Sequence, residues 1–210
     1  MVTKKALLKD VAYEKIKQKI LRGREDYTSE NTLVEELEMS RTPIREALQR
    51  LQYEGFIKII SNQGVVIPEL SVKETNDLFD MRIAIETFSL KQAVDITTKE
   101  DFEAMYRLIE EQKDAAQHND VFQFIEKDAE FHLYLLDIVG NHLFIQSFNN
   151  IKDRLHRTSR NLKTNTERLL LLAEEHVRII EFIKNKDIDR AVVEMENHLN
   201  GGKLNIYGGI

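Results

Sequence analysis

The sequence predicts a mainly α-helical protein in two parts, an N-terminal winged helix-turn-helix and an all-α helical bundle. Two observations support this fold class. Only 2 Pro and 8 Gly occur among the 210 residues, so few residues interrupt helices. The spacing of apolar residues indicates three helices and a β-hairpin before Pro68, and six longer helical segments after it. We therefore expect one domain over residues 1–69 and a second over residues 70–210.

Composition limits the compartment and the partners. Hydrophobic residues make up 42% of the chain, and there is no Cys for disulfides or thiolate metal sites. No apolar run approaches the ~18 residues of a membrane span, and the N-terminus lacks the long apolar core of a signal peptide. We therefore expect a cytoplasmic protein with no membrane partner. The net charge is −6, but residues 1–70 carry 12 Lys and Arg against 11 Asp and Glu, so DNA binding there would depend on a local patch.

Three short amphipathic segments open the chain. Apolar residues recur at helical spacing over residues 10–22, 29–38 and 41–53. Ser40 is the expected N-cap of the third helix, and Pro43 is tolerated in its first turn. FIKII and VVIP then flank SNQG, which predicts two strands joined by a turn.

This order of elements is that of a winged helix-turn-helix, which reads DNA with its second helix. The first turns of the helix over 41–53 would project Arg41, Thr42 and Arg45 away from its apolar face, and Arg suits guanine edges and phosphates. The hairpin tip, Asn62, Gln63 and Gly64, would lie near the minor groove or the DNA backbone, with Gly64 allowing a positive φ. We predict that these six residues contact DNA. The alternative is a small helical domain with solvated arginines.

Six helical segments follow Pro68 and are separated by short polar turns. We place them at roughly 72–95, 98–117, 120–139, 142–163, 167–184 and 187–199. The last ten residues, GGKLNIYGGI, are expected to form a loose tail.

Four polar residues fall on the apolar faces of these later helices. Asp128 and His132 are four residues apart in DAEFH and so share one helix face, whereas His176 and His198 come from two later helices. A polar side chain in an apolar interior is costly without a partner, and one carboxylate with three imidazoles can hold a divalent ion. We predict a metal site of Asp128, His132, His176 and His198, with Zn or Ni preferred and Mn, Co or Fe(II) as alternatives. For any single histidine, the alternative is a hydrogen-bonded core residue.

Two further assignments concern isolated polar residues. Arg82, in DLFDMRIAIE, lies on or near an apolar helix face, where its charge calls for an anion. The alternative is a salt bridge to Glu86 or another acid. His118, His142 and His156 fall near helix ends or on polar faces, so we expect them at the surface.

Sequence motifs in the first part resemble a known family. MSRTPIREALQRLQYEGFI closely resembles the recognition region of GntR-type bacterial transcription regulators, and TSENTLVEELEMS is similar to the segment before it. The resemblance implies that Arg41, Thr42 and Arg45 contact DNA with the wing tip assisting. The chain departs from the family at Asn31, where Arg is frequent, and at Glu38, where Gly is usual. Glu38 would cost about 1 kcal/mol if a positive φ is required there.

The second part resembles the all-helical FCD effector domain of the FadR subfamily, through DMRIAIE, DAEFHLYLLDIVGN, EEHVRIIEFI and ENHL. In many such domains the Asp and three His of these motifs bind a metal ion, and here they are Asp128, His132, His176 and His198. The resemblance also implies effector contacts from Arg82 and from Asn141, for which a helix N-cap is the alternative.

These features lead to one functional expectation with two alternatives. We expect a homodimeric transcription regulator, in this family more often a repressor, that binds a pseudo-palindromic operator in double-stranded DNA. A small carboxylic acid bound at the metal would control its affinity for DNA. The first alternative is a metal-dependent, hydrolase-like enzyme, although no inward acid is an obvious general base and an enzyme has no use for a helix-turn-helix. The second is a regulator with a purely structural metal or an acyl-chain effector.

Overall fold

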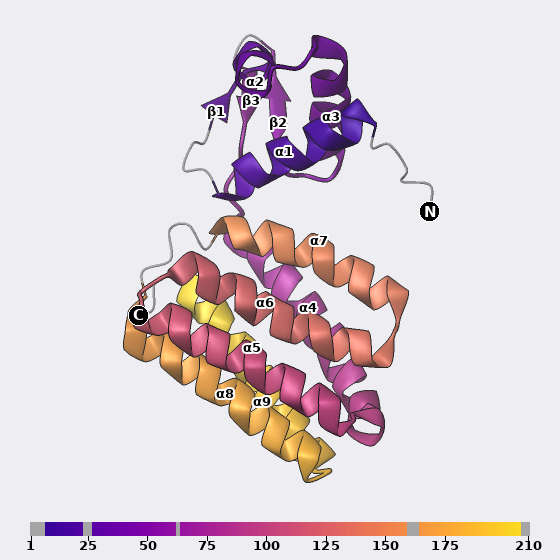
Figure 1. The fold of residues 1–210 in the computed structure, drawn as a ribbon, viewed down its shortest axis with the longest axis vertical. Coiled ribbons are helices and arrows are strands. Elements are labelled where there is room, and N and C mark those ends of the chain that lie inside the picture. Colours follow the sequence, from indigo (N-terminus) through magenta and orange to yellow (C-terminus); the bar gives the residue numbers. More distant parts are fainter. Residues whose placement is uncertain (1–6, 23–26, 62–63, 159–163, 207–210) are drawn as a thin grey trace. The chain divides into compact units, whose positions relative to one another are not determined.

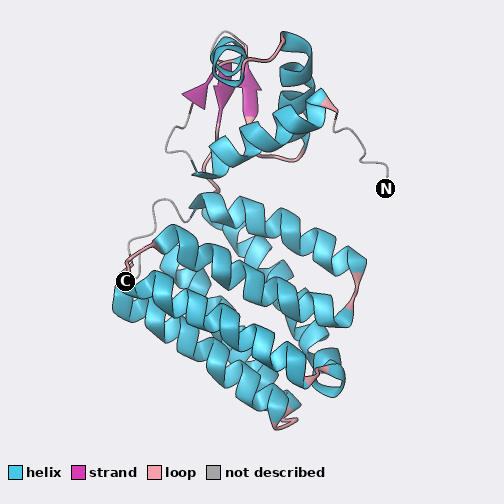
Figure 2. Ribbon diagram, in the orientation of Figure 1, coloured by secondary structure: helices cyan, strands magenta, loops and turns pink. Residues whose placement is uncertain are grey.

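The computed structural model describes residues 7–22, 27–61, 64–158 and 164–206. The chain forms two compact units, residues 1–69 and residues 70–210, each with hydrophobic cores of its own. Both are mainly helical, and the strands drawn in Figure 2 all belong to the first unit.

The first unit combines three helices with a small sheet (Figure 1). Its helices are α1 (Leu8–Arg22), α2 (Glu30–Leu37) and α3 (Arg41–Tyr53), and its strands are β1 (Tyr27–Thr28), β2 (Lys58–Ile60) and β3 (Gly64–Val66). The sheet order is β1-β3-β2 with both pairs antiparallel, and Val65 of β3 pairs with Ile59 of β2. The helix-turn-helix and the hairpin agree with the prediction, but the sequence did not indicate β1.

The turn between α2 and α3 contains the departure at Glu38. Ser29 caps the start of α2 by accepting a hydrogen bond from the backbone amide of Thr32. Glu38 ends the helix with φ 52° and ψ 40°, the left-handed conformation that normally favours Gly. The third helix then begins at Arg41 with Ser40 as its N-cap residue.

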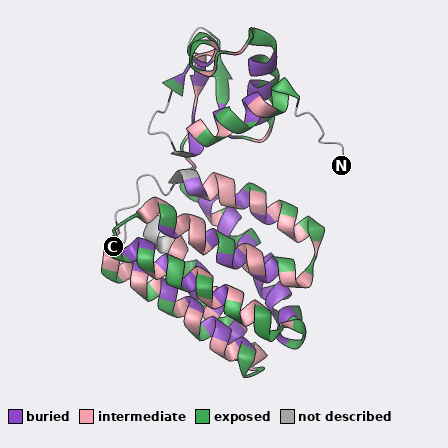
Figure 3. Cartoon of the chain, viewed as in Figure 1, coloured by how far each residue is buried: buried purple, intermediate pink, exposed green. Residues whose placement is uncertain are grey.

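The second unit is a bundle of antiparallel helices (Figure 1). They are α4 (Val72–Ile96), α5 (Lys99–Gln117), α6 (Val121–Val139), α7 (His142–Thr158), α8 (Thr166–Lys184) and α9 (Ile188–Ile206). Capping boxes start α4 (Ser71 and Glu74) and α5 (Thr98 and Asp101). Helix α6 packs against α4, α5 and α7, while α9 packs against α4 and α8, so inward residues of α6, α8 and α9 share one interior. Figure 3 shows buried residues along the inner faces of these helices.

One element boundary differs clearly from the sequence prediction. Helix α9 continues through Gly201 and Gly202 to Ile206, whereas a loose tail was expected from residue 201. Helix α7 is described as far as Thr158, and residues 159–163 of the predicted segment lie outside the described residues. Among the described helices, none is both long and apolar enough to cross a membrane.

Candidate metal centre

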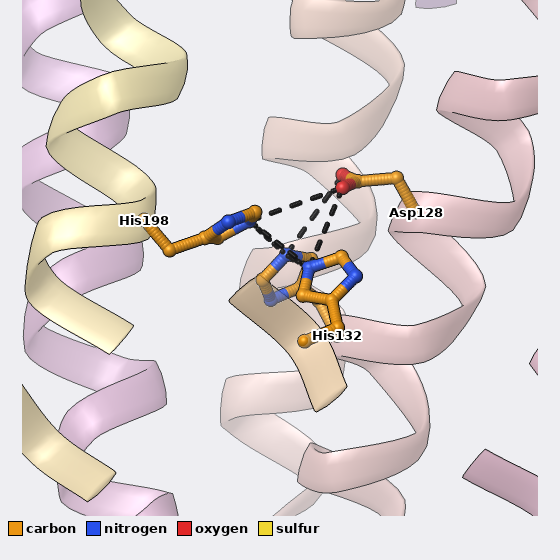
Figure 4. Close-up of side chains that lie close together, drawn as sticks. Asp128, His132 and His198 are labelled. Atoms are coloured by element: carbon orange, nitrogen blue, oxygen red, sulfur yellow. Dashed lines mark hydrogen bonds and ion pairs between the residues drawn. The ribbon is translucent and has the colours of Figure 1, made fainter. Parts of the chain in front are cut away.

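Three helices bring the four predicted metal ligands together. Helix α6 supplies Asp128 and His132 one turn apart, α8 supplies His176 and α9 supplies His198. Each offers a ligand atom within 4.8 Å of the others. All three histidines are buried, and Figure 4 shows His132 and His198 turned toward Asp128.

The Nε2 atoms of the three imidazoles face one another. The distance is 3.2 Å from His132 to His198, 3.3 Å from His132 to His176, and 3.0 Å from His176 to His198. The Asp128 carboxylate completes the group, with oxygens 3.6 Å from Nε2 of His176 and 3.8 Å from Nε2 of His132. Imidazole nitrogens that each lie ~2.0–2.1 Å from one metal ion are separated by about 3 Å, so this spacing fits a shared cation.

Acceptors behind two of the rings determine which nitrogen carries the proton. Nδ1 of His176 lies 2.8 Å from the amide oxygen of Gln112, and Nδ1 of His198 lies 2.8 Å from a carboxylate oxygen of Glu175. The amide nitrogen of Gln112 donates to the Lys127 carbonyl, which leaves its oxygen facing His176. Both acceptors therefore require a proton on Nδ1.

The third ring, that of His132, also has an acidic residue next to its Nδ1 atom. Nδ1 of His132 lies 2.6 Å from a carboxylate oxygen of Glu86 on α4. With a proton on each Nδ1, a neutral imidazole has a bare lone pair on Nε2, so three lone pairs converge. A divalent cation relieves their repulsion, and acceptors behind ligating imidazoles are typical of metal sites.

Burial favours the neutral form of two of the candidate ligand imidazoles. Removal from solvent lowers the pKa of His176 well below its ordinary value, and His198, His132 and Arg82 add to this effect. Burial also lowers the pKa of His132, although Glu86 opposes the change. Burial alone would raise the pKa of Glu86, but Arg82 and His132 bring it down to about 2. A buried carboxylate therefore stays ionised behind a neutral ring.

A cavity of about 110 Å³ adjoins the centre, and Asp128 and His198 form part of its wall. Most of the remaining wall is apolar, with phenylalanine and leucine side chains such as Phe79, Phe124, Phe148, Leu169 and Leu172.

Arg82 also lines this cavity, and its guanidinium has both a partnered and an unpartnered nitrogen. Its side chain donates from Nε to Glu86 at 2.7 Å, the salt bridge offered as the alternative. Its Nη2 is buried without a hydrogen-bond partner, and the rings of Phe79 and Phe148 lie 5.6 and 5.4 Å from the guanidinium. One edge of the guanidinium is thus neutralised, and the other still has hydrogen-bond donors for an anion.

Sequence reasoning missed two ionisable residues of the cavity wall. Lys152 and His156 lie on α7, and both line the cavity. The expectation that His156 is a surface residue was wrong, because it is only 3% exposed, stacks edge-on against Phe122 and lies 3.3 Å from Glu126. The spacing of Phe148, Lys152 and His156 by four residues, which places them on one face, was the available signal.

Asn141 lies elsewhere. Its side-chain oxygen accepts hydrogen bonds from the backbone amides of Leu143 and Phe144 at 3.1 and 3.4 Å, at the start of α7. It is not among the described residues that line the cavity. The structure thus shows the N-cap contacts that were its alternative.

Both units match known protein families. The model for the FCD domain matches residues 77–201, and the model for bacterial regulatory proteins of the gntR family matches residues 8–67. The chain belongs to the GntR family. Its FCD domain assigns it to the FadR-like subfamily.

Relatives and solved structures agree with this assignment. The gluconate operon transcriptional repressor of Bacillus subtilis is 29% identical over 199 residues, which cover 90% of this chain and 80% of the relative. The HTH-type transcriptional regulator YdhC of the same species is 26% identical, covering 90% of this chain and 86% of the relative. McbR/YncC of E. coli has the same fold, with a TM-score of 0.84 at 20% identity over 97% of this chain and 98% of that one. The metal-free FCD domain of TM0439 has a TM-score of 0.54 at 23% identity, over 66% of this chain and 95% of that one.

In this GntR-family chain, the predicted DNA contacts lie on α3 and at the start of β3. Arg41, Thr42 and Arg45 are exposed on the first turns of α3, and Arg45 pairs with Glu30 of α2 at 2.8 Å. Gly64 has φ +91°, and a Cβ there would lie 2.6 Å from the Tyr27 hydroxyl. The strand β3 therefore requires glycine at this position. Asn62 and Gln63 lie outside the described residues.

Proposed function

We propose that this GntR-family regulator is a homodimeric repressor whose affinity for its operator is set by a small carboxylic acid bound beside a divalent metal ion. The observation that carries the proposal is the convergence of three Nε2 atoms within 3.3 Å, beside a cavity whose wall includes Asp128, His198 and Arg82. The names of the relatives support a regulator, and that of the gluconate operon protein supports repression.

Asp128, His132, His176 and His198 would hold the ion, with Zn or Ni preferred for this donor set and Mn, Co or Fe(II) as alternatives. When bound, the ion supplies positive charge and free coordination positions at the edge of the cavity. Gln112, Glu175 and Glu86 hold the imidazoles in the tautomer and orientation that binding requires.

Arg82 would bind the carboxylate of the effector through Nη2. That atom is buried without a partner, and a guanidinium edge binds a carboxylate with directional, charge-assisted hydrogen bonds. The acid can switch DNA binding only if it favours one state of the protein over another.

The first unit would read the operator. Arg41, Thr42 and Arg45 would enter the major groove, and the hairpin tip with Gly64 would approach the adjacent backbone or minor groove. A dimer with two such units matches a pseudo-palindromic site in double-stranded DNA.

Two exposed apolar side chains of the helical bundle support a dimer. Phe88 on α4 is 51% exposed and Leu143 on α7 is 72% exposed, which is consistent with a second copy covering these side chains.

The competing functions have weaker support. A hydrolase needs a general base beside the metal, but Glu86 and Glu175 both contact the Nδ1 side of ligand imidazoles. A long acyl chain needs more room than the 110 Å³ of the cavity.

Replacement of one ligand tests the metal centre. We expect His176→Ala to lower the metal bound per subunit from one to well below one, because the remaining donors no longer enclose the ion. Metal analysis and native mass spectrometry of the full-length protein would measure this, with circular dichroism as a check on folding. His118→Ala, which removes an exposed histidine from the end of α5, is the control and should retain one ion. Equal metal content in the two variants would refute the site.

A further inference from the structure

Among the residues that the structure describes, the cavity wall combines apolar and ionisable side chains and lacks neutral hydrogen-bonding ones. Its polar residues are Arg82, Asp128, Lys152, His156 and His198. No Ser, Thr, Asn, Gln or Tyr side chain occurs among the described residues that line it. A ligand with several hydroxyl groups would therefore leave most of them unpaired, which is costly in a buried site.

Two cations on the wall suit one carboxylate. Arg82 presents a buried Nη2 without a partner, and Lys152 is half-buried on α7, one turn beyond Phe148, whose ring contacts the Arg82 guanidinium. No described residue forms a hydrogen bond or an ion pair with the Lys152 ammonium. Asp128, the one acid among the described residues of the wall, belongs to the proposed metal centre. The cavity wall thus offers an unpartnered guanidinium nitrogen and an ammonium without a described partner, among mainly apolar side chains.

The volume limits the size of the ligand. An engineered apolar cavity of ~150 Å³ accommodates benzene, so the 110 Å³ here corresponds to about four to six non-hydrogen atoms. This is the size of a short aliphatic acid.

We propose that the effector is a compact, unhydroxylated monocarboxylate with an apolar body of at most three carbons, and that Lys152 is a further residue that binds its carboxylate. This inference rests on the proposed function, because it names the class of acid for the same cavity. The carboxylate would lie toward Arg82 and Lys152, beside the residues that would hold the metal, and the hydrocarbon body would contact Phe124, Leu169 and Leu172.

Titration calorimetry on the zinc-loaded, full-length protein tests the class of acid. The probes are isobutyrate, gluconate and decanoate. We expect isobutyrate to bind at least about tenfold more tightly than gluconate, whose hydroxyls find no partners, and than decanoate, whose chain exceeds the cavity. Equal or tighter binding of gluconate or decanoate overturns the inference and leaves the metal-dependent regulator intact. Binding of none of the three acids to protein that retains its metal overturns both the inference and the proposed acid effector.

A cavity-lining variant tests the origin of the selectivity. Leu172→Asn adds an amide to the wall, and we expect it to reduce the preference for isobutyrate over gluconate by about tenfold. Leu171→Asn is the matched control, because Leu171 is its neighbour on α8 and is 49% exposed. A preference that is unchanged in Leu172→Asn would overturn the proposed position of the hydrocarbon body.

A second variant tests the added carboxylate contact. Lys152→Met keeps an unbranched side chain one atom shorter and removes the charge, and we expect isobutyrate to bind about tenfold more weakly while the zinc content stays at one per subunit. Lys91→Met, at an exposed position of α4, should bind isobutyrate as the unmodified protein does. Unchanged binding in Lys152→Met would remove Lys152 from the site.

Discussion

At the scale of single residues, Glu38 carries the clearest conformational cost. It is exposed, and it ends α2 in the left-handed region without the freedom of glycine. We expected strain at Glu38 only if this position required a positive φ, and its φ of 52° is positive.

Glu38→Gly should therefore stabilise the protein. We expect the free energy of unfolding of the first unit to rise by up to about 1 kcal/mol, because glycine adopts this conformation without a steric penalty. Urea unfolding followed by circular dichroism measures the change. Glu35→Gly, in the middle of the same helix and also exposed, should lower stability by about 1 kcal/mol, so the two variants should differ in sign. A loss of stability in both would show that the turn does not strain Glu38.

His156 predicts a pH dependence of stability. Burial lowers its pKa in the folded protein, although Glu126 opposes this, so the unfolded chain takes up a proton at higher pH than the folded chain. The free energy of unfolding is then greatest above pH ~6.5, which is the ordinary pKa of an imidazole. It falls as the pH drops below that value, by at most about 1.4 kcal/mol per pH unit for each such group. His132 and His176 act in the same direction in metal-free protein.

We expect His156→Gln to reduce the stability lost between pH 7 and pH 5.5. Urea unfolding in EDTA at both pH values gives this difference, which is independent of any change in absolute stability. His118→Gln, at an exposed position, should keep the full loss. If His156→Gln lost as much stability as the unmodified protein, the buried imidazole would not be a source of the pH dependence.

The clustering of the four proposed metal ligands could be predicted from sequence because each interrupts an apolar helical stripe, as Asp128 and His132 do four residues apart. Their outer partners could not be predicted in the same way. Gln112, Glu175 and Glu86 come from α5, α8 and α4, so their approach to the imidazoles depends on how the helices pack. His156 was misassigned because its position near the end of a helix suggested solvent, although packing against Phe122 buries it.

At the scale of elements, hydrophobic periodicity located every helix of the bundle, but glycine misled the prediction at its end. Gly201 and Gly202 continue α9 because their turn packs on the bundle, and Gly202 lines the cavity beside Phe79. The two-residue strand β1 was missed because it depends on pairing with β3, which adjacent residues do not reveal.

Gly201→Ala should strengthen the end of α9. A Cβ at this position would lie 3.3 Å from Nη2 of Arg168, the mobile tip of a long side chain, so the methyl group can be accommodated. We expect the free energy of unfolding of the second unit to rise by up to about 1 kcal/mol, because alanine favours helix. Thermal and urea unfolding would measure it. Gly140→Ala is the informative comparison, since φ +72° at the end of α6 should make that change destabilising. A stabilising Gly140→Ala or a strongly destabilising Gly201→Ala would contradict this assignment.

At the scale of the whole molecule, two units with separate cores divide the tasks of the regulator. The proposed DNA contacts lie on α3 and the wing of the first unit, and the proposed metal and acid sites lie in the bundle. The FadR-like assignment follows from both units together, because neither family model alone spans the chain.

Arg45→Ala tests the DNA-reading function of the full protein. Arg45 lies on an exposed turn of α3 and forms an ion pair with Glu30. Removal of a base contact should weaken binding to the operator by about 1–3 kcal/mol, while binding to unrelated DNA changes little. Fluorescence anisotropy at several salt concentrations separates these effects. A uniform loss on all DNA sequences, with a shallower dependence on salt, would mean that Arg45 contacts only phosphate. Arg107→Ala, on the helical bundle, is the control for loss of one exposed positive charge.

The three convergent imidazole nitrogens also bear on how long the protein survives in a cell. A bound ion stabilises a folded chain by an amount that grows with the logarithm of the ratio of free ion to dissociation constant, about 2.7 kcal/mol at a hundredfold ratio. Without the ion, nitrogens 3.0–3.3 Å apart repel, and a larger fraction of chains is open to proteases. With the proposed centre, cells short of the metal would hold fewer copies of the regulator. Its target genes would then respond to nutrient metal through protein turnover, with no change in the acid.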